Sequence, residues 1–528
     1  MKKCSGENPR RVLGTKGDSI KKKPERQRKN HSRKYFAGKD SAEGHPLGSF
    51  RTVLFVHSPE ARGTVGTKVQ GAASFEQYII FFNNQNAKYV FFKYKKQAYN
   101  GGISERTKGD VTMFQTASRM EALPFSGIRV MMERANRMAR EGIDVIHMEI
   151  GRPDFDTPQL IKDALYESVQ KGNVFYTSNY GTNELRQAIC RKLERDNHVA
   201  YKPEEILVTV GVGEGTYAAI AAFLNEGDEV LVPDPVWLNY IHVPHFFGAK
   251  PVTYGLREEN NYQIDPAEIE SLITERTKML ILNTPGNPTG TVQTRRTLEA
   301  LAKLAEKNDL IVVSDEIYEK LVYGGAEHVS FASLPGMRER TVTLNGFSKC
   351  YSMTGWRLGY AAAPVEFIRG MVRVHQYINT CAPSFVQEAG ITALEQGEPE
   401  VERMRLEYER RRDCAVQAIN SIEGLSCLAP TGAFYLFVNI KALGMSSREA
   451  ADYLLETAHV ATVPGSAFGK NGEGYLRLSY ACAYERIIEA MERIRKALAA
   501  RKNQGASEQT GCGADLLLAT LADLFRAS

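Results

Sequence analysis

The 528-residue chain lacks any run long and apolar enough to cross a membrane as a helix. Its purely apolar runs are short, as at residues 78–82, whereas a transmembrane helix needs about 20 such residues. Basic residues near the N-terminus lack the apolar stretch that a secretory signal places behind them. The eight cysteines are scattered, with no CxxC pair and no histidine at zinc-ligand spacing. We therefore expect a cytoplasmic protein with reduced thiols.

Most of the chain carries no excess of positive charge. The excess is concentrated near the N-terminus. Residues 1–40 carry 14 Lys and Arg against four Asp and Glu, so a net charge of +5 leaves the remainder about five units negative. This balance argues against a nucleic-acid-binding body. Because the N-terminal tract is too polar to form a core, we predict that residues 1–112 are a basic, poorly ordered extension. An aggregation-prone appendage or an over-extended start would have the same texture.

Short regular patterns occur within both end segments. Two aromatic runs, residues 78–82 and 89–92, flank an Asn-rich stretch and predict a weak β-hairpin. Residues 501–528 are interpreted as a polar linker and a loosely docked helix, with a partner-binding helix as the alternative. That helix has a single apolar stripe, formed by Leu517, Leu521 and Leu524.

From about residue 112 to residue 500, segments with helical periodicity alternate with short β-rich runs. This alternation predicts an α/β fold with a mostly parallel central sheet flanked by helices. The expected strands cover residues 206–209, 229–232, 279–282, 310–314 and 341–344. Each is followed by a loop containing Gly, Pro or Ser, which is where such sheets bind ligands. A charged helix over 401–422 is expected to begin a second, smaller unit.

One segment carries the main chemical signal, Asn345-Gly-Phe-Ser-Lys349-Cys-Tyr-Ser-Met-Thr-Gly-Trp-Arg357. Lys349 follows an expected strand, lies among small residues and precedes Arg357 by eight positions. A lysine that forms a Schiff base needs a lowered pKa, which a desolvated, cationic neighbourhood supplies. Since a single lysine is usually a solvated surface residue, this interpretation depends on the whole string.

With this segment the chain resembles the class I/II (fold type I) pyridoxal 5′-phosphate (PLP)-dependent aminotransferases, in particular the aspartate aminotransferase-like branch. The resemblance runs from about residue 124 to residue 498 and includes several further motifs in the family's order. They are Gly151-Arg-Pro-Asp-Phe-Asp-Thr-Pro158, Tyr176-Thr-Ser-Asn-Tyr-Gly-Thr-Asn-Glu-Leu-Arg186, Pro285-Gly-Asn-Pro-Thr-Gly290, Ser314-Asp-Glu-Ile-Tyr318, Pro430-Thr-Gly-Ala-Phe-Tyr435, Pro464-Gly-Ser-Ala-Phe-Gly469 and Tyr475-Leu-Arg-Leu-Ser479. The resemblance implies a large PLP-binding domain over 159–400, a small α+β domain over 401–500, and an N-terminal arm over 113–158 that also completes the small domain.

The resemblance also implies roles for residues around the cofactor ring. Lys349 would hold PLP as a Schiff base and move a proton during the reaction. Asp315 would pair with the pyridine nitrogen, so that the ring can accept electrons. Asn287 and Tyr318 would hydrogen-bond the phenolic oxygen, and Trp237 would stack on the ring. Taken singly, Asp315 also fits a helix N-cap, Asn287 a turn, and the two aromatic residues core packing.

A glycine-rich turn is expected to hold the cofactor's phosphate. Gly211-Val-Gly-Glu-Gly215 lies between a strand and a helix expected to begin near Thr216, so the amides of Val212 and Gly213 would face the anion. The third glycine comes one place too early for a dinucleotide-binding motif. Ser348 would add a hydroxyl to this phosphate site.

Arginine and tyrosine complete the set that the resemblance implies. Arg357 would bind the phosphate, and Arg477 would grip the substrate α-carboxylate with a bidentate fork. Gly151 would let the substrate approach closely because it lacks a Cβ. Tyr176 matches a tyrosine that reaches the phosphate from the neighbouring subunit, which implies a homodimer with shared active sites.

Two positions depart from the family pattern. Gly346 stands where many members have Ser or Thr, so one phosphate contact is missing. Gly213 stands where some aspartate-specific relatives have Lys, which leaves the contact with a distal carboxylate unassigned. His242 and His245 have no third ligand nearby in sequence, and no metal site is expected.

We predict an aminotransferase that moves an amino group from an L-amino acid, with aspartate favoured, to a 2-oxo acid, with 2-oxoglutarate as the expected acceptor. Alanine and aromatic amino acids are the alternative donors. A PLP-dependent lyase or synthase on the same fold is a second alternative. A PLP-binding transcription regulator is a remote one, because residues 1–112 show no helix-turn-helix pattern.

Overall fold

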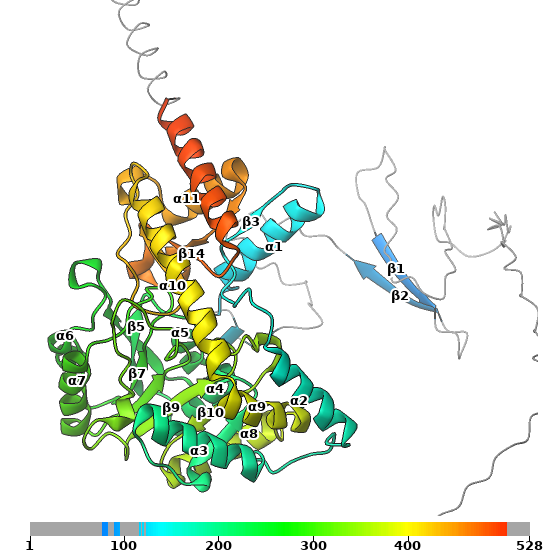
Figure 1. Ribbon diagram of the computed structural model, residues 1–528, viewed down its shortest axis with the longest axis vertical. Helices are drawn as coiled ribbons and strands as arrows, with labels where there is room; N and C mark the ends of the chain where they lie inside the picture. Colours follow the sequence, from blue (N-terminus) through cyan, green and yellow to red (C-terminus); the bar gives the residue numbers. More distant parts are fainter. Residues whose placement is uncertain (1–76, 83–88, 95–115, 118, 121–122, 504–528) are drawn as a thin grey trace, which may run out of the picture. The chain divides into compact units, whose positions relative to one another are not determined.

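The computed structural model describes residues 77–82, 89–94, 116–117, 119–120 and 123–503. The chain divides into two compact units, Met1–Val111 and Thr112–Ser528. In the first unit, β1 (Gln77–Phe82) and β2 (Tyr89–Tyr94) form an antiparallel pair, so the two predicted hairpin strands are confirmed (Figure 1). The predicted basic tract within residues 1–40 and the predicted helix that contains Leu517, Leu521 and Leu524 lie outside the described residues.

A seven-stranded sheet forms the centre of the second unit, in the order β4-β10-β9-β8-β7-β5-β6. Its strands are β4 (Ile206–Thr209), β5 (Glu229–Asp234), β6 (Lys250–Gly255), β7 (Thr277–Asn283), β8 (Ile311–Asp315), β9 (Thr341–Gly346) and β10 (Gly359–Ala362). Neighbours pair in parallel except β10, which is antiparallel to both β4 and β9. The mostly parallel sheet predicted from the sequence is thus confirmed, with β6 and β10 added to the five expected strands.

Helices cover both faces of this sheet, as Figure 1 shows. Alternate residues of β4 face opposite layers: Val208 packs in one hydrophobic cluster and Leu207 in another. The Val208 layer contains α2 (Gln159–Gln170), α3 (Asn183–Asn197) and α9 (Ser384–Gln396), and the Leu207 layer contains α4 (Val212–Phe223) and α8 (Val365–Ile378). Because both faces are covered, nearly every residue of the central strands β8 and β9 is buried, including their polar ones.

A smaller α+β region follows α10 (Glu398–Asn420), the helix predicted over 401–422. Its antiparallel sheet has the order β11-β14-β13, with β11 (Tyr435–Asn439), β13 (Val463–Pro464) and β14 (Tyr475–Ser479). The helix over 484–503 and α11 (Ser447–Tyr453) belong to the same region. Side chains of α1 (Gly127–Arg140) and β3 (Ile146–His147) join its core, and β3 pairs in parallel with β12 (Val460–Ala461).

Over the described ranges, no helix has both the length and the apolar character needed to cross a membrane.

Candidate active site

Lys349 lies in the loop after β9, where its side chain reaches toward Gly151. Its Nζ donates a 2.7 Å hydrogen bond to the carbonyl oxygen of Gly151. The pKa of Lys349 is lowered to about 8, chiefly by burial and then by the positive charge of Arg477, while Asp315 opposes the shift. The amine is therefore neutral in a large share of molecules near pH 8, which is the form that acts as a nucleophile.

Asp315 is the last residue of β8, and only 3% of it is exposed. The hydroxyl of Tyr240 donates a short hydrogen bond to Oδ2, and the amide of Ile317 donates one of 3.0 Å to Oδ1. Burial raises the pKa of Asp315 to about 6, against the effect of the Tyr240 bond. Residues 317–320 form turns and no helix, so Asp315 is not a helix N-cap. A cation placed beside this carboxylate would favour its charged form.

Tyr318 and Tyr435 form a buried hydroxyl pair next to the lysine. Their hydroxyl oxygens lie 2.8 Å apart, and the Nζ of Lys349 lies 5.6 Å from the ring centre of Tyr318. A Cβ at Gly151 would lie only 2.7 Å from the Tyr435 hydroxyl. The absence of a side chain at Gly151 therefore lets its backbone reach Lys349 while the tyrosine pair stays in place.

Arg477 lies in the middle of β14 and is 1% exposed. Its Nη1 donates to Oδ1 of Asn287 at 3.2 Å, and its Nη2 donates to the carbonyl oxygen of Glu149 at 2.5 Å. The guanidinium also stacks near the rings of Tyr435 and Phe468, at 4.6 and 5.0 Å. Its Nε is buried and has no hydrogen-bond partner among the described residues. The Arg477 guanidinium is thus a buried cation of fixed orientation, and its Nε is a donor without an acceptor among the described residues.

The glycine-rich turn starts its helix earlier than the sequence predicts. Helix α4 begins at Val212, four residues before Thr216, with Gly211 as its N-cap at φ 80°. The prediction was wrong because Gly213 and Gly215 were taken as loop residues. A Cβ at Gly215 would lie 3.0 Å from Leu344, so close packing against the sheet accounts for that glycine inside the helix. The amides of Val212 and Gly213 are in the first helical turn, where amides lack intrahelical partners.

Arg357 lies against this helix start. It has a left-handed backbone (φ 56°), and its Nη2 donates to the carbonyl oxygen of Val210 at 3.3 Å. A Cβ at Gly211 would lie 2.5 Å from that Nη2, so the missing side chain makes room for the guanidinium. Ser348 is 9% exposed and directly precedes Lys349. A helix N-terminus and an arginine therefore lie together, as in an anion-binding site.

Trp237 connects the turn to the buried aspartate. A Cβ at Gly213 would lie 3.5 Å from the Trp237 ring, and this ring packs edge-on against Tyr240 with centroids 5.4 Å apart.

At Gly346, a Cβ would lie 2.8 Å from the Cα of Gly359. Crowding by β10 thus accounts for the absence of Ser or Thr at position 346.

Tyr176 is not brought to the other predicted residues within this chain. It lies in the loop between α2 and α3 and is 87% exposed. In the part of the chain that the structure describes, it has no hydrogen bond or ring contact with the residues around Lys349. Its predicted role in a neighbouring subunit stays a prediction.

The family model for "Aminotransferase class I and II" matches residues 143–494. This chain belongs to the class I and II aminotransferases. The aspartate aminotransferase of Pyrococcus abyssi is 45% identical over 389 residues, which are 73% of this chain and 99% of that protein. Aromatic-amino-acid aminotransferase 2 of Thermococcus litoralis is 44% identical over 390 residues, again 73% of this chain and 99% of the relative. The solved aspartate aminotransferase from Thermus thermophilus with maleate is 38% identical, has a TM-score of 0.70, and is aligned over 73% of this chain and 100% of its own.

Membership confirms the predicted family, fold type and cofactor. The protein is a PLP-dependent aminotransferase of fold type I, and it transfers an amino group between amino acid and oxo acid substrates. The residues of this aminotransferase fit the cofactor on physical grounds, since an amine of lowered pKa, a buried carboxylate and an anion-binding helix start lie around one site.

Some residues of the site were not predicted from the sequence. Tyr240, which holds Asp315, follows Trp237 by three positions, and a turn in which the Tyr240 amide donates to the Trp237 carbonyl oxygen at 3.2 Å brings the two residues close. Tyr435 ends a motif that the sequence displays, although its partner Tyr318 lies 117 positions away. Glu149 is fully buried two residues before Gly151, and no sequence pattern indicates that its carbonyl oxygen accepts from Arg477.

Among the described residues, the side chains that could together hold a metal ion do not include His242 or His245. Glu316, Glu319 and His328 offer ligand atoms within 4.8 Å of one another. This cluster already has protein partners: Lys192 pairs with Glu319, and Nε2 of His328 lies 3.2 Å from Glu316. We therefore interpret it as a buried polar network that supports the loop after β8.

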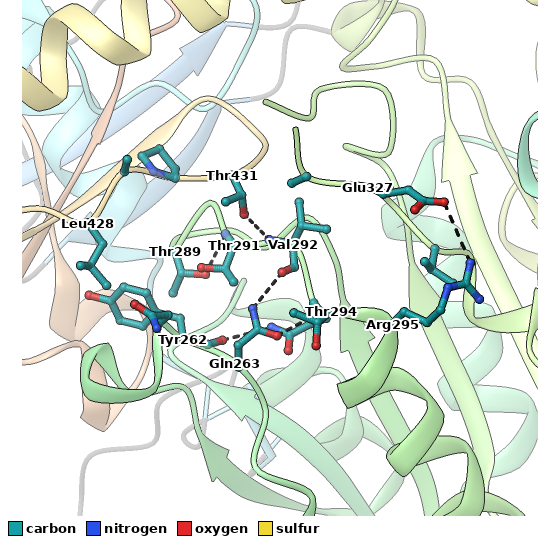
Figure 2. A pocket seen from close by; sticks show the side chains of 16 residues that line it. Tyr262, Gln263, Thr289, Thr291, Val292, Thr294, Arg295, Glu327, Leu428 and Thr431 are labelled. Carbon is teal, nitrogen blue, oxygen red and sulfur yellow. Dashed lines mark hydrogen bonds and ion pairs between the residues drawn. The ribbon is translucent and has the colours of Figure 1, made fainter. Parts of the chain in front are cut away.

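A separate cavity of about 420 Å³ lies beside the loop that carries Asn287. Figure 2 shows that its polar lining groups bond one another. Gln263 donates to the carbonyl oxygen of Val292 at 2.9 Å and accepts from the amide of Thr294 at 2.9 Å, while Thr431 accepts from the amide of Val292 at 2.8 Å. The Tyr262 hydroxyl also lines this cavity and is buried without a partner among the described residues, but none of the residues around Lys349 lines it.

Proposed function

We propose that this aminotransferase takes aspartate as its favoured amino donor and 2-oxoglutarate as its acceptor. The observation that carries this proposal is the 45% identity to an aspartate aminotransferase across almost that whole protein. The Thermus thermophilus relative with maleate, a dicarboxylate, supports an acidic substrate. The 44% identical aromatic-amino-acid aminotransferase supports aromatic donors as the second candidate.

In this proposal, Lys349 holds PLP covalently. Asp315 would pair with the pyridine nitrogen, Trp237 would stack on the ring, and Asn287 and Tyr318 would bind its phenolic oxygen. The depth of Asp315, with its pKa raised by burial, supports this pairing because a pyridinium would supply the cation that the buried carboxylate needs.

The phosphate is assigned to the start of α4. The first-turn amides of Val212 and Gly213, the Ser348 hydroxyl and the Arg357 guanidinium would hold it. Tyr176 of a second copy of the chain would complete this set. The left-handed turn at Arg357, which brings its guanidinium against Gly211, supports the assignment.

When bound, PLP supplies an electron sink for the carbanion formed at the substrate Cα. Arg477 grips the substrate α-carboxylate, which would satisfy the buried Nε and orient Cα toward Lys349. Gly151 keeps the Lys349 amine in place through its carbonyl oxygen. Freed when the substrate amine takes its place on the cofactor, the neutral amine would remove the proton from Cα as general base and deliver it to C4′ of the cofactor as general acid.

We also infer a homodimer with shared active sites. The loop carrying Tyr176 exposes neighbouring apolar side chains, with Phe175 at 80%, and Tyr377 at the end of α8 is 88% exposed. These two segments lie together, since Asn179 donates to the carbonyl oxygen of Thr380 at 2.7 Å. Exposed apolar side chains on two adjoining segments favour a protein interface.

A panel of amino acids, each supplied with 2-oxoglutarate and followed by mass spectrometry, tests the substrate proposal. We expect glutamate and oxaloacetate to form fastest from aspartate. A tenfold faster reaction with tyrosine or phenylalanine would assign the aromatic class instead. Release of ammonia with no glutamate formed would contradict amino transfer and favour a lyase.

A further inference from the structure

A buried hydrogen-bonded pair lies behind the turn assigned to the phosphate. Glu214 belongs to the first turn of α4, and His375 lies near the end of α8. The Nδ1 of His375 is 2.5 Å from Oε1 of Glu214, and the two side chains are 0% and 7% exposed. The transfer chemistry uses neither residue, so the pair requires another explanation.

The second oxygen of Glu214 holds the turn itself. Oε2 accepts a 2.6 Å hydrogen bond from the backbone amide of Val210, on the other side of Gly211. The carbonyl oxygen of the same Val210 accepts from Arg357. A continuous chain of hydrogen bonds therefore runs from His375 through Glu214 and Val210 to Arg357.

Glu214 is in a position where a free carboxylate would compete with a phosphate. A Glu at the third position of a helix ordinarily accepts from the backbone amide of the N-cap residue, which here is Gly211. Here Glu214 reaches past Gly211 to the amide of Val210, and the neighbouring amides of Val212 and Gly213 are the ones assigned to the phosphate. Anchored to Val210 and His375, the carboxylate is held by other donors and leaves those amides to the ligand.

The surroundings of His375 indicate that this anchoring is its main polar role. It packs in an apolar layer of α4 and α8 with Ile368, Met371 and Val372 as helix neighbours. Its Nε2 is buried without a hydrogen-bond partner in the described ranges. A polar ring in such a layer costs free energy that an aliphatic side chain of similar size would not. The bond to Glu214 is what distinguishes His375 from such a side chain.

We propose that His375 is a positioning residue for the cofactor's phosphate, acting by holding Glu214 against Val210 so that the first-turn amides and Arg357 stay oriented toward the ligand. The inference rests on the phosphate site of the proposed function. It predicts a defect that concerns the phosphate group and spares the rest of the cofactor.

Full-length His375→Leu and His375→Asn variants, stripped of cofactor and reloaded, test this role. Leu removes the donor, whereas the amide of Asn lies close to the place of Nδ1 and restores it. Binding of PLP and of pyridoxal, which lacks the phosphate, is followed by absorbance. We expect His375→Leu to weaken PLP affinity about tenfold, equivalent to about 1.4 kcal/mol, with pyridoxal affinity unchanged. His375→Asn should stay within about twofold of the parent for both.

A matched Arg357→Gln variant separates the possible failures. If Arg357→Gln weakens PLP binding but His375→Leu does not, the inference is overturned and the phosphate site stands. Equal loss of PLP and pyridoxal in His375→Leu also overturns it, because that result indicates only a disturbed fold. Unchanged PLP affinity in Arg357→Gln overturns the phosphate site and the inference with it. Should His375→Leu unfold, His375→Met carries the same test, since a flexible thioether fills irregular space in a core.

Discussion

The two sheets of the catalytic unit contribute to the site in different ways. The seven-stranded sheet places Asp315 at the end of β8 and Lys349 in the loop beyond β9. The three-stranded sheet places Arg477 inside β14, where 1% of it is exposed. Loops at strand ends give polar groups room to surround a large cofactor, whereas a strand interior fixes one cation rigidly. The groups proposed to hold the cofactor and the substrate thus come from two different sheets, which are joined by the hydrogen bond from Arg477 to Asn287.

Replacing Lys349 by Ala breaks the large-sheet half and has the largest expected effect. Nucleophile and proton carrier are lost together, so turnover should fall by several orders of magnitude. PLP should still bind, because Asp315 and the phosphate turn remain. Steady-state kinetics and cofactor absorbance measure both, with Lys171→Ala on the exposed surface as the control. Turnover within tenfold of the parent would rule out the assigned role.

Arg477→Lys breaks the small-sheet half alone. Lysine cannot form the bidentate fork, so KM for the amino acid should rise and kcat/KM should fall. The fall should correspond to a loss of roughly 2–3 kcal/mol of transition-state stabilisation. Cofactor absorbance should persist, because that half is held elsewhere. The exposed Arg373→Lys serves as the control. Parent-like kinetics on a carboxylate substrate would show that another residue grips the carboxylate.

The pH dependence of PLP attachment to Lys349 tests whether the two halves interact through charge. The pKa of Lys349, lowered to about 8 first by burial and then by Arg477, means that the neutral amine increases as pH rises through about 8. The capture rate of the cofactor-free enzyme should follow this rise. In Arg477→Leu the positive charge is gone, so the profile should move to higher pH. A profile that stays in place would show that the two halves are electrostatically independent.

Removal of residues 1–111 should have the smallest effect. This segment forms a separate unit, and the family match begins at residue 143. Absorbance, dimer and turnover should stay within about twofold of the full chain, while any salt-sensitive attraction to polyanions is lost. Size-exclusion chromatography and the transamination assay measure these quantities. Loss of activity together with the dimer would place the boundary elsewhere.

Much of the fold was predictable because apolar strands and glycine-rich loops alternate in a regular way. Strand β10 was not, because Gly-Tyr-Ala-Ala lacks the branched residues typical of strands and is held by pairing on both sides. Among site residues, Lys349, Asp315 and Arg477 lie in long motifs. The hydrogen bond between Glu214 and His375 joins residues 161 positions apart, and only the packing of α4 on α8 brings them together.

Chemical trapping tests most directly whether Lys349 holds the cofactor. Borohydride reduction of the PLP-loaded enzyme, followed by proteolysis and mass spectrometry of the peptides, locates the attached pyridoxyl group. We expect a single modified peptide containing residues 345–357, with the added mass on Lys349. Modification at any other lysine, or none after complete reduction, would contradict it.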